Sequence, residues 1–139
     1  MRYWNFPASK TVAETERALG WLAKTSSPYD HLAWTVADPA DNQCIGMVNY
    51  HHREVRNRRL EIGYIIGRKH QGKGFGTEAV HARTGDASDE ALIHPENTAS
   101  TRLVERLGFR CEGGPLTDYW CVGDKYLSVM VYALISCNR

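Results

Sequence analysis

The run Gln71-Gly72-Lys73-Gly74-Phe75-Gly76 is the most informative stretch of the chain, and the helix-forming segment 77–80 follows it directly. Glycines at alternate positions let the backbone turn tightly and leave no Cβ atoms in the way of a close ligand. Successive backbone N–H groups of such a loop can point into one concavity, and the helix after it adds the positive end of its dipole. The stretch therefore predicts a pyrophosphate-binding loop. A glycine-rich surface turn without a ligand is the alternative.

The glycine spacing excludes two common nucleotide loops. A P-loop reads G-x-x-x-x-G-K-[ST], whereas Lys73 is followed by Gly74. A dinucleotide-binding loop reads G-x-G-x-x-G, and here the third glycine comes one residue too early. The pattern that remains is Q-x-x-G-x-G, placed after the strand-like segment 61–66.

A second motif follows further along the chain. His94-Pro95-Glu96-Asn97-Thr98-Ala99-Ser100 leads into a segment that ends Leu107-Gly108-Phe109. Asn97 is a good helix N-cap, and Gly108 stands where a left-handed C-terminal cap belongs. Four residues predict one apolar helical face: Ala99, Leu103, Val104 and Leu107.

Together, in this order, the two motifs resemble the GNAT acetyltransferases, in particular the RimJ/RimL group that acetylates the N-termini of ribosomal proteins. The resemblance implies an α+β fold: a mixed, mostly antiparallel sheet with helices on both faces. The usual N-terminal strand and part of the central helix region, within 81–93, are expected to be missing. It also implies acetyl transfer from acetyl-CoA to a primary amine, by direct attack in a ternary complex. The expected acceptor is a protein N-terminal α-amino group. The alternatives are a small-molecule amine, or a CoA-binding module that has lost catalysis.

The same resemblance implies where the cofactor binds. The pyrophosphate is expected on the backbone N–H groups of Gly72, Lys73, Gly74, Phe75, Gly76 and Thr77, with Gln71 positioning the loop. The pantetheine arm is expected to pair with the backbone of Ile65 and Ile66 like an added strand. Asn97 is expected to help hold that arm; the alternative is that Asn97 serves only as a helix cap.

Two residues are expected to carry the chemistry. Glu61 is the candidate general base, acting directly or through a water, and a salt bridge to Arg59 or another surface arginine is its alternative. Ser100 is expected to supply a hydroxyl to the leaving thiolate; otherwise it only occupies the first turn of its helix. An acidic residue that serves as base in the RimJ/RimL group falls at Tyr119 here. The neighbouring Asp118 is expected on the other strand face.

The remaining elements follow from local patterns. A helix is predicted from Thr11, with Glu14 as a capping-box partner and Val12, Leu19, Leu22 and Ala23 as its apolar side. Strands are predicted at 31–37, 44–50, 60–66, 91–93, 119–122 and 126–134, the first three as an antiparallel meander. Segment 86–90 is polar and is not assigned to a strand. Arg53, Arg56, Arg58 and Arg59 are interpreted as a solvated hairpin tip.

Composition describes one ordinary domain covering residues 1–139, with 42% hydrophobic residues, 24% charged residues and a net charge of +1. So small a charge argues against nucleic acid as a partner. The start of the chain is not a signal peptide and no apolar stretch could span a bilayer, so we expect a cytoplasmic protein without a membrane partner. A sheet edge left unpaired makes a homodimer possible.

No metal site is expected. The four cysteines form no C-x-x-C pair and have no Cys/His ligand spacing, and Cys44, Cys111 and Cys121 are expected to be reduced core thiols. His51-His52 invites a metal interpretation, but neighbours on a strand point to opposite faces and cannot easily chelate one ion.

Overall fold

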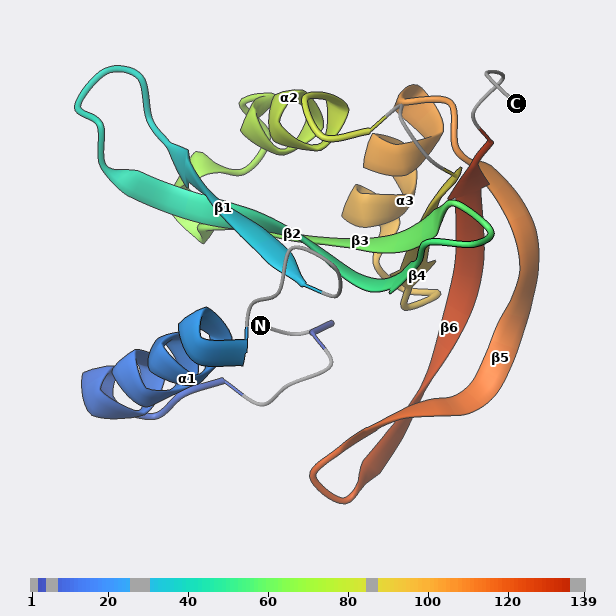
Figure 1. Ribbon diagram of the computed structural model, residues 1–139, viewed down its shortest axis with the longest axis horizontal. Helices are drawn as coiled ribbons and strands as arrows, with labels where there is room; N and C mark the ends of the chain where they lie inside the picture. The colour runs from blue at the N-terminus through green and yellow to red at the C-terminus, as the bar shows by residue number, and fades with distance from the viewer. Residues whose placement is uncertain (1–2, 5–7, 26–30, 85–87, 136–139) are drawn as a thin grey trace.

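The described part of the chain folds as a six-stranded sheet with three α-helices (Figure 1). The computed structural model describes residues 3–4, 8–25, 31–84 and 88–135. The strands are β1 (Leu32–Ala37), β2 (Cys44–Glu54), β3 (Arg59–Ile66), β4 (Ser88–Ile93), β5 (Arg110–Val122) and β6 (Lys125–Leu134), and the helices are α1 (Val12–Thr25), α2 (Phe75–His81) and α3 (Thr98–Arg106). A short 3₁₀ turn, Arg68–His70, leads from β3 into the glycine loop.

The strand order is β1-β2-β3-β4-β6-β5. The first three strands form the predicted antiparallel meander, and the arginine-rich segment between β2 and β3 is an exposed turn, as predicted. Among the described strands, β3 and β4 are the one parallel pair, over Arg59–Glu61 and Ser88–Glu90 only. Beyond Glu61 the two strands separate. This separation creates the site described below.

Helices α2 and α3 cover one face of the sheet (Figure 1). Val80 from α2 and Val104 from α3 are fully buried, and they meet Val48, Ile62 and other sheet residues in one core cluster. The caps of α3 are as predicted: Asn97 Oδ1 accepts a hydrogen bond from the Ser100 N–H, and Gly108 has a φ of 91°. Local sequence signals therefore set the ends of this helix.

The prediction for α1 is correct at its start and wrong for its apolar face. The Glu14 N–H donates to Thr11 Oγ1 at 3.2 Å. The Glu14 carboxylate accepts from the Lys10 N–H rather than from the Thr11 N–H expected in a capping box. Val12 and Leu19, however, are 75% and 54% exposed. Figure 1 shows α1 on the opposite side of the sheet from α2 and α3, set away from it. Periodicity cannot tell whether another element lies against a face. The side chains of Leu22 and Ala23 lie outside the described residues.

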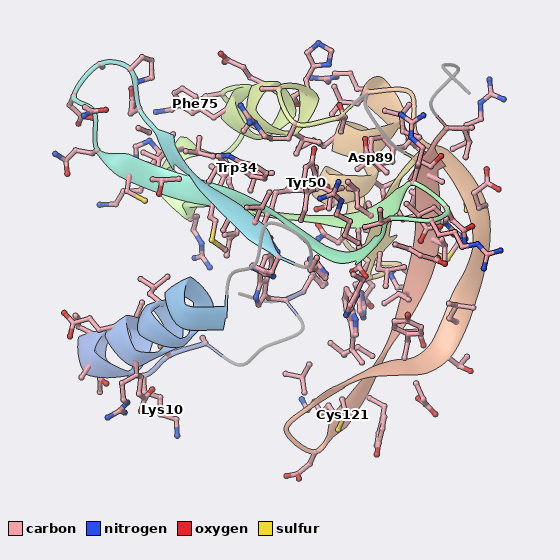
Figure 2. All side chains as sticks on the ribbon, viewed as in Figure 1. Lys10, Trp34, Tyr50, Phe75, Asp89 and Cys121 are labelled. Atoms are coloured by element: carbon pink, nitrogen blue, oxygen red, sulfur yellow. The ribbon has the colours of Figure 1, made fainter. Side chains whose placement is uncertain are left out.

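Three other predictions are wrong. The polar segment before Ala91 belongs to β4, where Ser88 and Asp89 are buried. Strand β5 begins nine residues before the predicted Tyr119, because register irregularities let the strand continue through its glycines and proline. Cys44, Cys111 and Cys121 are exposed rather than core thiols. Figure 2 shows Cys121 near the far end of the β5–β6 hairpin. The errors at the cysteines and at Ser88 and Asp89 arise because the residue pattern along a strand does not reveal which face is covered.

The core assignment predicts a clear stability difference. Val104→Ala leaves a cavity in a fully buried position, so the free energy of unfolding should fall by about 1–3 kcal/mol. Val55→Ala, at a residue that is 61% exposed, is the matched control and should change it by less than about 0.5 kcal/mol. Urea unfolding followed by circular dichroism measures both. Equal effects of the two substitutions would contradict the assigned core.

Candidate active site

A cavity of about 300 Å³ lies where β3 separates from β4. It brings Glu61, Asn97 and Ser100, which were predicted separately, onto one lining. The other described lining residues come from both strands and their neighbours: Tyr3, Trp4, His31, Asn49, His51, His52, Ile62, Gly63, Tyr64, Ala91, Leu92, Ile93, His94 and Trp120. Residues 71–77 are not part of this lining.

After Glu61, β3 and β4 diverge like the arms of a fork, and within the described part of the chain no strand pairs with the β3 backbone on that open side. The Gly67 N–H donates to Ile45 O at 2.8 Å, so the alternation of an antiparallel pair directs the backbone groups of Ile65 toward β2. The groups of Tyr64 and Ile66 then face the other way. Ile66 O accepts from Gln71 Nε2 at 2.8 Å. On this register Tyr64, rather than the predicted Ile65, shares the open edge with Ile66.

The glycine loop has the conformation that its sequence predicts. Gly72 and Gly74 have φ values of 75° and 91°, and a Cβ on either would meet no atom within 4 Å. Gly74 is also the N-cap of α2. At Gly76 the reason for glycine is packing, because a Cβ would come within 3.1 Å of Leu103 Cδ1. Gln71 ties the loop to the end of β3 through its bond to Ile66 O.

The loop also presents unpaired backbone donors. The first helical hydrogen bond of α2 runs from the Glu78 N–H to Gly74 O, at 3.0 Å. Within the described part of the chain, no acceptor bonds the N–H groups of residues 72–77. Together with the open space at Gly72 and Gly74, these donors fit an anionic group such as a pyrophosphate.

Helix α3 places Asn97 and Ser100 on the cavity wall. Asn97 Oδ1 caps the helix by accepting from the Ser100 N–H at 3.3 Å. Ser100 O accepts from the Tyr64 hydroxyl at 3.4 Å, which ties α3 to β3. Among the described residues, Asn97 Nδ2 and Ser100 Oγ have no hydrogen-bond partner. Both groups are therefore available to a ligand.

Glu61 lies at the branch point of the fork and contacts two histidines. Its carboxylate oxygens are 2.9 Å from His51 Nε2 and 2.9 Å from His52 Nδ1. The predicted alternative of an ion pair with Arg59 is wrong, because Arg59 pairs with Glu90. The prediction that the two histidines point to opposite faces is also wrong. A β-bulge between His51 and Glu54 puts an extra residue in β2, and His52 has a φ of 50°.

The environment keeps Glu61 ionised. Burial by itself raises the pKa of Glu61, but the hydrogen bonds and charges of His51 and His52 lower it, and the net pKa lies below the ordinary value of 4.5. An ionised carboxylate can accept a proton at neutral pH.

Tyr64 and the aromatic and histidine lining were missed by the sequence interpretation. Burial raises the pKa of Tyr64 to about 12, with its hydrogen bond to Ser100 O acting in the other direction, so its hydroxyl stays protonated. His94 and Trp120 reach the cavity from segments next to β4 and within β5. Only the position of His94 in the second motif was a usable signal. Tyr119 and Asp118 do not line the cavity.

A larger cavity, about 460 Å³, lies beside the β2–β3 turn. Trp34, Tyr50 and several arginines line it, and the Arg83 guanidinium lies 4.8 Å from the centre of the Trp34 ring. Figure 2 labels Trp34 and Tyr50, two aromatic residues of this lining. This cavity contains none of the predicted site residues, so the fork is the better candidate for catalysis despite its smaller volume.

His31, on the cavity lining, predicts an acid-sensitive stability. Burial, followed by the charges of His51 and His52, lowers the pKa of His31 from 6.5. Below pH 6.5 the unfolded chain therefore binds more protons at this residue than the folded chain, and stability falls as pH falls. His31→Gln should shrink the drop in Tm between about pH 7.5 and about pH 5.5. Glu61, with its pKa below 4.5, contributes little to this window. The exposed-site control His81→Gln should retain the wild-type drop, and a full wild-type drop in His31→Gln would contradict the assignment.

Comparison with known proteins agrees with this geometry. Residues 1–110 match the model of an acetyltransferase (GNAT) domain. An uncharacterized N-acetyltransferase, p20, of Bacillus licheniformis is 35% identical over 141 residues, covering 96% of this chain and 79% of the relative. The uS5-alanine N-acetyltransferase of Escherichia coli K12 is 33% identical over 106 residues, covering 70% of this chain and 54% of the relative.

A solved structure supports the fold. Spermidine N-acetyltransferase from Vibrio cholerae, in complex with CoA and spermine, has a TM-score of 0.75 and 21% identity, covering 98% of this chain and 82% of that one. The predicted α+β fold and the predicted resemblance to the RimJ/RimL group are thus confirmed. The chain belongs to the GNAT acetyltransferase family and is an acetyl-CoA-dependent N-acetyltransferase.

Proposed function

We propose that the amine acceptor is the α-amino group of a protein or peptide N-terminus. The observation that carries the proposal is the charge of the cavity. Glu61 is the one carboxylate among its described lining residues, beside histidines and aromatic rings. A polyamine carries several ammonium groups and would be matched by several carboxylates, whereas a single amine needs only one.

The chemistry of the acceptor supports the same choice. A lysine amine has a reference pKa near ~10.4, and an α-amino group has one near ~7.7–8.0. At neutral pH a larger fraction of α-amino groups is already deprotonated, so one carboxylate suffices as base. The E. coli relative is named as acting on the alanine of ribosomal protein uS5, which agrees with such an acceptor. The Vibrio structure is named for spermidine, which makes a small-molecule amine the alternative.

The described residues can hold acetyl-CoA along one continuous path. The N–H groups of residues 72–77 bind the pyrophosphate, and Gln71 fixes their loop to β3. The open backbone edge at Tyr64 and Ile66 pairs with the pantetheine arm. Asn97 Nδ2 donates a hydrogen bond to the arm while Asn97 Oδ1 caps α3. The thioester is thereby brought to the branch point of the fork, next to Glu61.

Glu61 and Ser100 then act on the attacking amine and on the leaving sulfur. Glu61 accepts a proton from the attacking amine, directly or through a water, while His51 and His52 hold its carboxylate in place. The Ser100 hydroxyl donates a hydrogen bond to the sulfur as the carbon–sulfur bond breaks, which stabilises the leaving thiolate until it takes a proton from solvent. The Tyr64 bond to Ser100 O keeps α3 in register with β3 for this step.

The loop assignment predicts a specific loss of cofactor binding. Gly74→Ala forces an alanine to a φ near 91°. Its stability should fall by about 1–2 kcal/mol, and CoA should bind more weakly because the loop N–H groups shift. Gly20→Ala, in α1 and with no atom near its Cβ, is the control and should bind CoA normally. Calorimetric titration with CoA measures this, and wild-type affinity in Gly74→Ala would contradict the loop assignment.

The catalytic assignment predicts separate losses for two substitutions. Glu61→Gln keeps the shape but cannot accept a proton, so kcat/KM should fall about 10²–10⁴-fold. Ser100→Ala should cost about 10–100-fold, since it removes one hydrogen bond to a charged group. Glu16→Gln, on the exposed side of α1, is the control and should retain activity. The assay follows free thiol released from acetyl-CoA with Ser- and Ala-initiated peptides, with their N-blocked forms and with spermidine.

Each proposed part has its own contradictory result. Unchanged rates in both variants would reject the catalytic residues. Faster turnover of spermidine than of free-amine peptides would reject the acceptor. A Tm raised by CoA without turnover of any amine would identify a CoA-binding module instead.

A further inference from the structure

Three potential metal ligands converge on the wall of the cavity. One ligand atom each from His51, His52 and Glu61 lies within 4.8 Å of the other two. Two imidazole nitrogens and a carboxylate oxygen are a donor set that zinc uses in proteins, commonly as three protein ligands with a fourth position left open. Each imidazole nitrogen is 2.9 Å from a different oxygen of the Glu61 carboxylate, His51 Nε2 from Oε1 and His52 Nδ1 from Oε2. Ligands of a tetrahedral zinc ion lie about 3.3 Å apart, so small side-chain adjustments would be enough to place an ion among the three residues.

The backbone is bent to bring these side chains together. His52 has a φ of 50°, in the left-handed region that few residues other than glycine adopt, although histidine enters it more readily than most. In a regular strand His51 and His52 would lie on opposite faces. The bulge instead turns both rings toward one carboxylate, with their centroids 4.9 Å apart. Backbone conformations of this kind concentrate at functional sites.

A neighbouring side chain holds the His51 ring, whereas the exposed His52 side chain is able to rotate. His51 Nδ1 lies 3.0 Å from Asn49 Nδ2, and Asn49 is buried. Asn49 Oδ1 is buried and has no hydrogen-bond partner among the described residues. A half-turn of this amide lets Oδ1 accept from His51 Nδ1–H, which leaves the lone pair of Nε2 free for a metal ion. The His52 side chain is 79% exposed and can rotate inward without displacing the core.

A second unpartnered polar atom belongs to another residue of the same cavity lining. His31 Nε2 is buried without a partner among the described residues, and its ring centroid lies 6.2 Å from that of His51. A cation bound here would replace the direct contacts from Glu61 to the two histidines. The alternative is that these contacts only hold Glu61 in place, and this alternative predicts no specific metal affinity.

We propose that His51, His52 and Glu61 form a Zn²⁺ site whose fourth position opens into the cavity. Zinc there would occupy the carboxylate that accepts the proton in acetyl transfer, so it would inhibit the enzyme; this consequence alone rests on the proposed function. Metal binding itself does not depend on the proposed function.

The test uses Co²⁺ as a spectroscopic probe for the zinc site. The exposed cysteines are first alkylated with iodoacetamide so that thiolates do not contribute. Full-length wild-type protein should then bind one equivalent of Co²⁺, with visible d–d bands that Zn²⁺ abolishes. His52→Asn, which keeps a residue tolerant of positive φ, and Glu61→Gln should each weaken binding by at least about tenfold. His81→Asn, on α2, is the matched control and should bind like wild type.

Two results would overturn the site: no saturable Co²⁺ binding, or equal binding by wild type, His52→Asn and Glu61→Gln. A thiol-release assay with Zn²⁺ separates this inference from the proposed function. If Co²⁺ binds as described but Zn²⁺ does not slow acetyl transfer by wild type, the metal site stands and the role of Glu61 as base fails.

Discussion

The end of the parallel pairing between β3 and β4 is the constraint on which the site depends. The two strands pair only as far as Glu61 and Glu90, and after that point β3 follows β2 while β4 follows β6. The separation leaves an unpaired backbone edge at Tyr64 and Ile66 and opens a cavity of about 300 Å³. Unpaired groups of this kind are costly when buried, so an open strand edge favours a ligand that can pair with it. Helix α3 closes the fork from one face, and the Tyr64 hydroxyl bond to Ser100 O fixes its position.

At the branch point, Glu61 is partly buried and yet stays ionised, two properties that ordinarily conflict. A half-buried carboxylate would ordinarily have a raised pKa, yet the two histidines lower the pKa of Glu61 and keep it ionised. Holding it this way requires a β-bulge and a left-handed His52, so local backbone strain is used to control a charge. The same arrangement makes the carboxylate a competent metal ligand. Proton transfer and metal binding, both proposed for Glu61, would thus compete for one carboxylate.

Sequence signals were reliable where the determining interactions are local. The glycine loop, the Asn97 cap, the Gly108 terminus of α3 and the arginine-rich turn depend on neighbouring residues, and each has the predicted form. Predictions failed where contacts with segments distant in the sequence determine the burial or conformation of a residue. The exposure of Val12 depends on what lies against α1, and burial of Asp89 depends on its place between β3 and β6. The joint contact of His51 and His52 with Glu61 required a bulge that strand alternation does not reveal. The single-domain organisation and a homodimer through an unpaired sheet edge remain predictions.

Hydrogen–deuterium exchange with and without CoA tests the central claim most directly, because it reports on backbone N–H groups rather than on activity. The fork account predicts slower exchange on CoA binding in the loop 72–77 and at Tyr64 and Ile66, with Ile65 little changed because its N–H already pairs with β2. It also predicts no protection around Trp34 and Arg83 in the larger cavity. Protection confined to that cavity, or none in the loop and the open β3 edge, would contradict the account.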